Sequence, residues 1–150
     1  MYRHILIPTD GSELAEHAVT NGLSLAKSVG AKITVIIVED RFDWLSVPET
    51  RASQRQALDA LAKHNEQVKT HAANVLGRAA DAAKQAGVPC DTMQVEHAHP
   101  YQAIIAAASD RGCDLIVMGS HGRSGLSAVV LGSVTNKVLT HTKTPVLVYR

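Results

Sequence analysis

Short apolar runs alternate with longer segments of helical periodicity along the whole chain. Five runs are short enough for buried strands, and several are rich in β-branched residues; they cover residues 3–8, 31–38, 90–96, 114–118 and 145–149. Between them, apolar residues recur every three or four positions over 12–29, 51–86, 103–111 and 134–142. This alternation predicts an α/β protein with a five-stranded parallel sheet that helices cover on both faces.

Two helical segments carry further signals. The first has an N-cap candidate in Ser12, a stop at Gly30, and an inner face of Ala15, Ala18, Val19, Leu23 and Ala26. The segment 51–86 has a stripe of Leu58, Leu61, Val68, Ala72, Val75, Ala79 and Ala86. A continuous helix of that length would span about 50 Å, too long for a small sheet. We therefore expect either a break in it or a first half that projects.

The segment 39–49 is irregular and holds the only Phe and Trp of the chain, Phe42 and Trp44. It could form a lid over a pocket or part of an interface. A mobile connector, whose aromatic side chains rest on the nearest helix, explains it equally well.

The stretch from Gly119 to Ser133 contains four of the ten glycines and directly follows an apolar run. This order predicts strand, turn and helix. Gly119 ends the strand, Gly122 and Gly125 can adopt positive φ, and Ser133 is the expected N-cap of the last helix. Ser120, Ser124 and Thr135 add neutral donors, and Arg123 adds a cation. Free backbone N–H groups beside a helix N-terminus are suited to phosphate.

The loop matches neither of two common phosphate-binding fingerprints. No glycine is followed by Lys and then Ser or Thr, and G-x-G-x-x-G is absent. From the glycines alone, a phosphate site and a plain connection with capping glycines are equally supported.

Composition narrows the function classes. The length of 150 residues predicts a single domain over residues 1–150. A net charge of +1 gives no broad electrostatic footprint for nucleic acid or membrane. Cys90 and Cys113 fit no zinc or redox spacing and are expected to be free thiols. No signal segment or long apolar run is evident, which predicts a soluble cytoplasmic protein.

Two further sites have open interpretations. If the first and fourth strands are neighbours, Asp10 faces Gly119 across the crevice where parallel sheets bind ligands. Its carboxylate could accept a hydrogen bond from an adenine amine or a ribose, or could instead organise the turn through Gly11 and Ser12. His97 and His99 could form a metal pair, but no third ligand is evident, which favours solvated loop histidines.

The chain resembles the universal stress protein family, in its ATP-binding subgroup. The resemblance rests on the opening HILIPTDGSE, on LIVMGSHGRSGLSAVVLGSVTNKVL and on the closing TPVLVYR, and it covers the whole chain. The middle segment contains G-x2-G-x9-G-[S/T], present as Gly119, Gly122, Gly132 and Ser133. One departure is the end of the third strand, where the family often has G-x-P and this chain has His97-Ala98-His99-Pro100.

The resemblance implies an adenine nucleotide alpha hydrolase-like fold of three layers, α/β/α, with strand order 3-2-1-4-5. It implies ATP, with Mg²⁺, in the central crevice. Carried over by position, Pro8, Thr9 and Asp10 line the adenosine side, Val38 meets the adenine, and Met118 and Gly119 lie near the ribose. The phosphate-holding positions are Gly122, Arg123, Gly132, Ser133, Val134 and Thr135. The resemblance also implies a homodimer, and Pro145–Tyr149 is the expected contact because an apolar edge strand favours pairing.

Three function classes follow. An ATP-binding stress-response or signalling regulator, with an unidentified protein partner, is favoured by the intact glycine signature. An enzyme on the same fold, such as a slow ATPase, is the alternative. Neither paired carboxylates nor a nucleophile elbow lies beside the loop, and His121 has no evident partner in the sequence, so no catalytic residue is predicted. A dimeric interaction protein without nucleotide would be expected to replace Gly122 or Gly132, and both are present.

Overall fold

A computed structural model describes residues 1–39, 51–121 and 131–150. Its strands are β1 (His4–Pro8), β2 (Lys32–Glu39), β3 (Cys90–Glu96), β4 (Leu115–Gly119) and β5 (Val146–Tyr149). Its helices are α1 (Glu13–Val29), α2 (Arg51–Ala86), α3 (Pro100–Asp110) and α4 (Ser133–His141). All strand pairs are parallel and the order is β3-β2-β1-β4-β5. The predicted fold class and strand order are confirmed.

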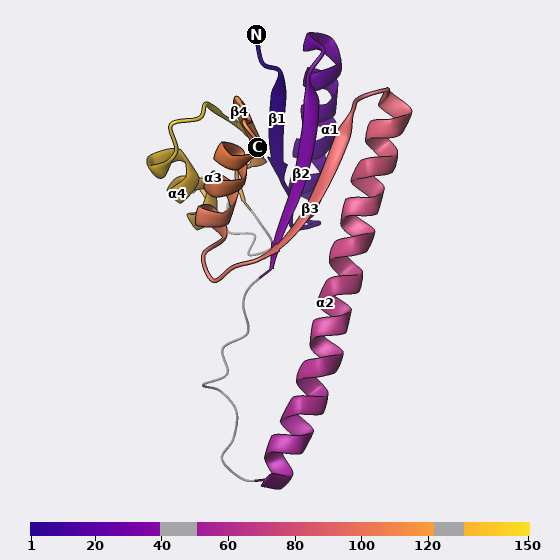
Figure 1. The fold of residues 1–150 in the computed structure, drawn as a ribbon. Coiled ribbons are helices and arrows are strands. Elements are labelled where there is room, and N and C mark those ends of the chain that lie inside the picture. The colour runs from indigo at the N-terminus through magenta and orange to yellow at the C-terminus, as the bar shows by residue number, and fades with distance from the viewer. Residues whose placement is uncertain (40–50, 122–130) are drawn as a thin grey trace.

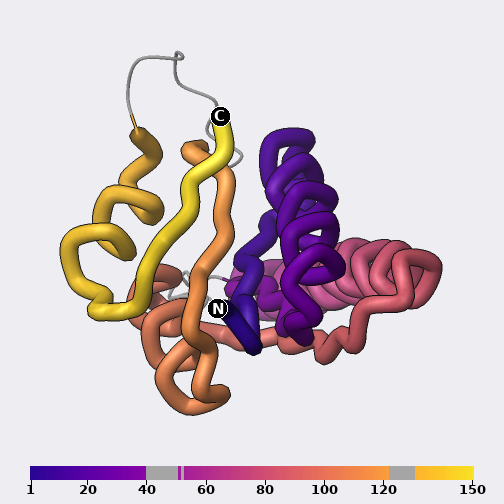
Figure 2. Tube along the Cα trace, turned by 90° about the horizontal axis from the view of Figure 1, so that it is seen from above, coloured from indigo at the N-terminus to yellow at the C-terminus, as the bar shows by residue number. Residues whose placement is uncertain are grey.

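The helices form a layer on each face of the sheet (Figures 1 and 2). Ile5 and Ile7 of β1 pack with α1 and α2, whereas Leu6, between them, packs with α3 and α4. This division follows from the alternation of side chains along a strand. All three are fully buried, so β1 forms the centre of the core.

Local signals placed α1 and α3 correctly. The Ser12 side chain caps α1 by accepting from the Ala15 N–H at 3.3 Å, and Gly30 ends the helix in the left-handed region at φ 69°. Helix α3 begins at Pro100, with His99 as its N-cap, as expected for a proline in the first helical turn, and it contains most of the alanine-rich segment predicted over 103–111.

Helix α2 is continuous over 36 residues, or about 54 Å, whereas β2 has eight residues and spans about 26 Å. Its first half therefore projects beyond the sheet (Figure 1). Of the two outcomes expected from the sequence, a break or a projecting first half, the second is confirmed. Leu58, in this projecting half, is 45% exposed, whereas Leu61, Ala72, Val75 and Ala79 of the predicted stripe are buried.

The amino ends of the strands form a closed polar network. The His4 ring lies 3.1 Å from the Arg111 carbonyl oxygen through Nδ1 and 2.8 Å from Thr34 Oγ1 through Nε2. A carbonyl only accepts, so Nδ1 carries the proton and the Thr34 hydroxyl donates to Nε2. Asp114 accepts from the N–H groups of Arg3 and His4. Burial, followed by the nearby Lys32 charge, lowers the pKa of His4.

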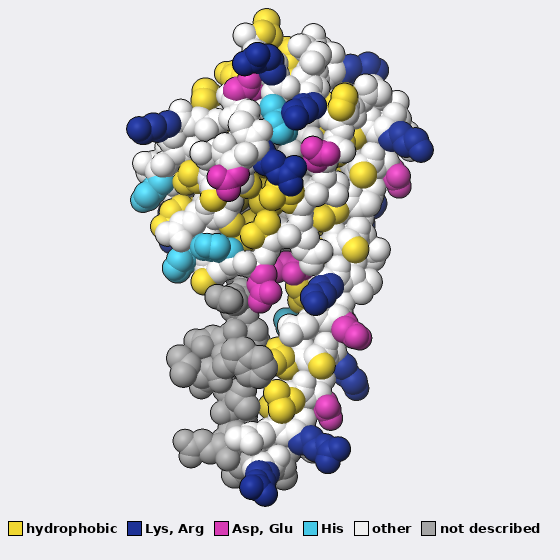
Figure 3. Space-filling model, in the orientation of Figure 1, with side chains coloured by type: hydrophobic (Ala, Val, Ile, Leu, Met, Phe, Trp, Pro, Cys, Tyr) yellow, Lys and Arg dark blue, Asp and Glu magenta, His cyan; other side chains and the backbone are white. Residues whose placement is uncertain are grey.

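The surface and the cysteines agree with the composition. Lys and Arg side chains are interspersed with Asp and Glu on the face shown in Figure 3. Cys90 and Cys113 are free, and burial raises the pKa of Cys113 to about 11. None of the helices in the described ranges combines the length and apolar character needed to cross a membrane.

Candidate functional site

A cavity of about 650 Å³ opens at the carboxyl ends of β1, β2 and β4, within the size range of small-molecule sites. The starts of α3 and α4 and the middle of α2 complete its wall. The structure brings ten of the predicted positions into this wall: Pro8, Thr9, Asp10, Val38, Met118, Gly119, Gly132, Ser133, Val134 and Thr135. Their binding roles stay predictions. Gly122 and Arg123 lie outside the described residues, as do Ser124, Gly125, Phe42 and Trp44.

The turn after β1 is built by its own side chains. Thr9 Oγ1 accepts from the Gly11 N–H at 3.2 Å, and Asp10 Oδ1 accepts from the Ser12 N–H at 3.0 Å. Gly11 has φ 77°, which favours glycine. Asp10 therefore does organise the turn, as the second interpretation of the sequence held, and it also lines the cavity.

Helix α4 points its N-terminus at the cavity, but its cap differs from the prediction. Gly132 is the N-cap, at φ −57° and ψ 150°, and as a glycine it has no side chain to cap the helix; Ser133 is the first helical residue. The prediction of Ser133 as N-cap was wrong because the last residue with non-helical backbone angles is Gly132, and Ser133 already has helical geometry. Helical geometry leaves the N–H groups of Ser133, Val134 and Thr135 without an acceptor inside the helix. The positive end of the helix dipole lies at the same place.

Two hydrogen bonds limit what the predicted phosphate positions offer. The Gly132 N–H donates to the Ser120 carbonyl at 2.7 Å, so this amide already has an acceptor. The Thr135 hydroxyl donates to the Gly119 carbonyl at 3.0 Å, and Thr135 is only 3% exposed. Thr135 Oγ1 thus joins α4 to the end of β4 in this structure, whereas the Ser133 side chain is exposed.

Two buried side-chain atoms in the described ranges have no hydrogen-bond partner, and both belong to residues that line this cavity. They are Glu39 Oε1 at the end of β2 and His121 Nε2 just after β4. The other atom of each group is held: Gln94 Nε2 donates to Glu39 Oε2 at 3.0 Å, and Ser120 Oγ lies 2.9 Å from His121 Nδ1. Buried polar groups are normally paired, so the cavity presents two unmet hydrogen-bonding requirements.

Sequence reasoning missed Glu39 as a site residue and gave His121 no partner. Glu39 could have been found because it directly follows Val38 at the carboxyl end of a parallel strand. Ser120 and His121 are adjacent in the sequence, and adjacent side chains of a strand point to opposite faces. Their contact was not predicted because it depends on β4 ending at Gly119, before these two residues.

Helix α2 supplies a wall that the sequence analysis did not predict. His64, Gln67, Val68 and His71 line the cavity at the spacing of one helical face. The helix lies close to the β1 turn: a Cβ at Gly11 would lie 2.8 Å from Val75 Cγ2 and 3.0 Å from His71 Nε2. Gly11 therefore provides both the φ of the turn and the space for α2.

The pair His97 and His99 lies on the rim. His97 Nδ1 accepts from the His99 N–H at 2.9 Å, so one ring nitrogen is already engaged. Over residues 1–39, 51–121 and 131–150, no group of three or more His, Cys, Asp or Glu is placed to hold a metal ion. Pro100, directly after the pair, lines the cavity where the family often has G-x-P.

Comparison with known proteins identifies the family of this chain. The model of the universal stress protein family matches residues 1–150. The chain belongs to this family. Universal stress protein MJ0531 of Methanocaldococcus jannaschii is 31% identical over 150 residues, which cover 100% of this chain and 83% of that protein.

Solved structures of universal stress proteins have the same fold. The structure of MJ0577, a protein of Methanocaldococcus jannaschii, superposes with a TM-score of 0.78 at 28% identity, covering 99% of this chain and 95% of that one. A universal stress protein solved in complex with cAMP gives a TM-score of 0.71 at 25% identity, covering 99% and 97%. The likeness establishes the adenine nucleotide alpha hydrolase-like fold for this universal stress protein.

Proposed function

We propose that this protein binds an adenine nucleotide, ATP together with Mg²⁺, in the cavity at the carboxyl ends of β1, β2 and β4. It then acts as a cytoplasmic, dimeric regulator in a stress response, through a partner protein. The observation that carries the proposal is that one cavity contains both a helix N-terminus and two buried polar atoms, Glu39 Oε1 and His121 Nε2, that have no partner in the part of the chain that the structure describes. A relative of the same fold, solved with cAMP, supports it.

The phosphate end of the ligand fits the start of α4. The N–H groups of Ser133 and Val134 and the helix dipole favour an anion there. His121 Nε2 lies in the same wall. When the Ser120 hydroxyl donates to Nδ1, the ring proton is on Nε2, which can then donate to a phosphate oxygen. Gly122 and Arg123 of the glycine signature belong to this proposal and lie outside the described residues.

The cation and the hydrolysis rate follow from the same residues. Mg²⁺ is usually held by phosphate oxygens with few protein ligands, and the exposed Ser133 hydroxyl is better placed than that of Thr135, which donates to Gly119. Among the described residues of the cavity wall, His121 is the only titratable group at the β4 and α4 end. When the Ser120 hydroxyl donates to Nδ1, Nε2 carries the ring proton and cannot accept one from water, so we propose little or no hydrolysis.

The proposed dimer uses the edge strand β5. In the described sheet β5 pairs only with β4, its residues are apolar, and Leu147 is 37% exposed. Such an edge favours pairing with a second copy through Pro145–Tyr149. Light scattering should show a dimer for the parent and a monomer for Leu147→Lys, since a charge on an edge strand opposes pairing. A parent that is monomeric at micromolar concentration contradicts the dimer.

Nucleotide binding is tested by mass spectrometry of the protein as purified, followed by calorimetric titration with ATP and Mg²⁺. We expect a co-purifying adenine nucleotide or, after its removal, saturable binding of ATP. Turnover faster than about one per second, near the low end of ordinary enzymes, would instead favour the ATPase alternative. Absence of binding by any adenine nucleotide contradicts the proposal.

A further inference from the structure

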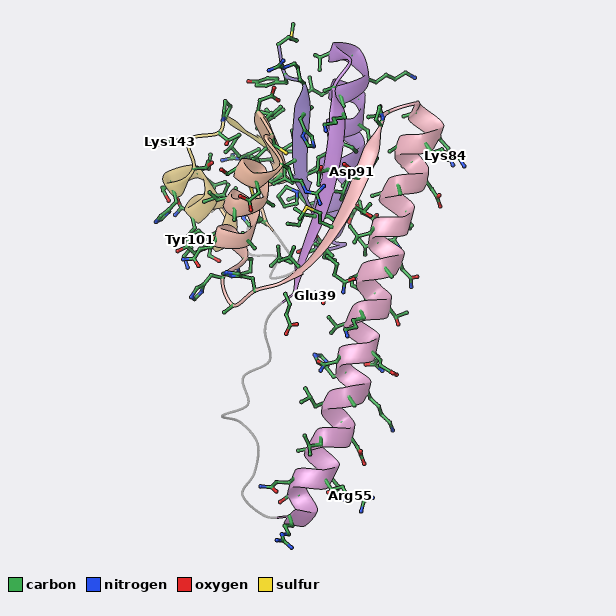
Figure 4. All side chains as sticks on the ribbon, viewed as in Figure 1. Glu39, Arg55, Lys84, Asp91, Tyr101 and Lys143 are labelled. Carbon is green, nitrogen blue, oxygen red and sulfur yellow. The ribbon has the colours of Figure 1, made fainter. Side chains whose placement is uncertain are left out.

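Glu39 is a carboxylate with one oxygen held and one oxygen unused. It is the last residue of β2, and Figure 4 shows its side chain extending beyond the end of that strand. Gln94, on the neighbouring strand β3, donates to Oε2 at 3.0 Å and so fixes the orientation of the carboxylate. Oε1 is buried, has no hydrogen-bond partner within residues 1–39, 51–121 and 131–150, and belongs to a residue that lines the cavity. A ligand N–H group would satisfy it.

The direction of a nucleotide in the cavity follows from its two ends. The anion-binding groups lie at the start of α4 and at His121, beside β4. Glu39 ends β2, which is two strands away because β1 lies between β2 and β4. Two strand spacings amount to about 9.6 Å, comparable with the separation of base and phosphate in a nucleotide. The wall at the β2 end includes the apolar side chains of Ile36, Val38 and Val68, which suit the faces of a base.

The chemistry of Oε1 selects among bases. A carboxylate that recognises guanine does so best with both oxygens, one for each of two neighbouring N–H groups. Here Gln94 already donates to Oε2, and Oε1 is the oxygen that has no partner among the described residues. A single acceptor matches the 6-amino group of adenine, whereas the 6-oxo group of guanine or hypoxanthine would place an acceptor against it.

We propose that Glu39 is a specificity-determining residue of the cavity, whose Oε1 accepts a hydrogen bond from the exocyclic 6-amino group of a purine base. Gln94 is the positioning residue that holds the carboxylate. This inference rests on the proposed nucleotide-binding function and adds which atom distinguishes one base from another.

The test is a cycle of two ligands and three proteins, measured by calorimetry. The ligands are ATP and purine riboside triphosphate, which lacks only the 6-amino group. The proteins are the parent, Glu39→Ala and the control Glu96→Ala. Glu96 is the register partner of Glu39 on β3, is exposed and does not line the cavity. Thermal melts establish that each variant is folded, and Glu39→Gln, which keeps the side-chain shape, replaces Glu39→Ala if the latter is not.

We expect the parent and Glu96→Ala to bind purine riboside triphosphate about ten- to a hundredfold more weakly than ATP, as for a lost hydrogen bond to a charged group. Glu39→Ala should bind both ligands with nearly the same affinity, and Glu39→Gln should show a reduced difference. An equal ratio in the parent and in Glu39→Ala overturns the inference while leaving nucleotide binding intact. A parent that binds neither ligand contradicts the proposed function itself, and the inference with it.

Discussion

The two ends of the sheet treat their polar groups differently. At the amino ends of the strands, both ring nitrogens of His4 and the carboxylate of Asp114 have partners within the chain. At the carboxyl ends, Glu39 Oε1 and His121 Nε2 are buried without a partner among the described residues, and the N-cap of α4 is a glycine, which has no side chain to cap the helix. Asp91, near the start of β3, and Glu39, at the end of β2, mark these two ends in Figure 4.

This difference separates stability from binding. Hydrogen bonds that are complete within the chain stabilise the fold whether or not a ligand is bound. Unpartnered groups at the other end cost stability in the free protein, and a ligand that satisfies them recovers it. Substitutions of the cavity groups that would contact a ligand should therefore change affinity more than stability, and substitutions within the His4 and Asp114 network should do the reverse.

The largest expected effect on binding is that of Gly132→Val. Gly132 has φ −57°, which any residue adopts, so the side chain should not strain the backbone. It would instead extend from a cavity-lining position into the space proposed for phosphate. Calorimetry should detect no binding of ATP or GTP, and the melting temperature without ligand should match that of the parent. Unchanged affinity in the folded variant contradicts the placement of the phosphates.

Gly11→Ala should reduce stability, by about 2 kcal/mol or more in the free energy of unfolding. The alanine would have to keep the positive φ of Gly11, and its Cβ would lie 2.8 Å from Val75 Cγ2. Gly87→Ala is the matched control: Gly87 has φ 71°, close to the 77° of Gly11, but no atom lies within 4 Å of its added Cβ. Urea denaturation should show a larger loss for Gly11→Ala. Equal losses would mean that the close approach of α2 has no energetic consequence.

The pH dependence at the amino ends gives the smallest effect. Burial holds the pKa of His4 below its ordinary value near 6.5, so below about pH 6.5 the unfolded chain binds a proton that the folded chain does not. The contribution of neutral His4 is therefore present above this pH and is lost on acidification. Lys32, Asp91 and Asp114 are the charged neighbours that modulate it.

Between pH 7.5 and 5.5 the melting temperature of the parent should fall by a few degrees more than that of His4→Gln, on the order expected for a single titrating group. Differential scanning fluorimetry at both pH values measures the difference. Equal slopes for the two proteins would show that His4 does not titrate differently in the folded and unfolded chains.

The elements that the sequence predicted well are those with local signals. Ser12 marks the start of α1 and Gly30 its end, because a capping hydroxyl and a left-handed glycine act within one turn. The β-branched residues in the middle of β2 are buried, as a continuous apolar run predicts. The predicted apolar stripe of α2 included Leu58 because periodicity shows which face of a helix is apolar. Periodicity does not show where the sheet beneath the helix ends.

Only the parts of the cavity that are contiguous in the sequence were predicted. The glycine signature and the β1 turn are contiguous in the sequence, so a pattern could identify them. The wall from α2 and the arrangement of Glu39 with Gln94 depend on how distant segments pack. Residues 39 and 94 are 55 positions apart, and only the register of β2 with β3 brings them together. Likewise the role of Gly11 in admitting α2 is visible only once Val75 and His71 are placed.

We propose that the carboxyl ends of the sheet form the ligand site and that the amino ends do not. Titration of isotope-labelled protein with ATP and Mg²⁺, followed by the backbone amide resonances, tests it at every described position. We predict large shifts at Thr9, Glu39, Ser133 and Val134, with none at His4, Thr34 or Asp114. Shifts confined to the amino ends, or none at a concentration of ATP that saturates a nucleotide site, would contradict a ligand site at the carboxyl ends of the sheet.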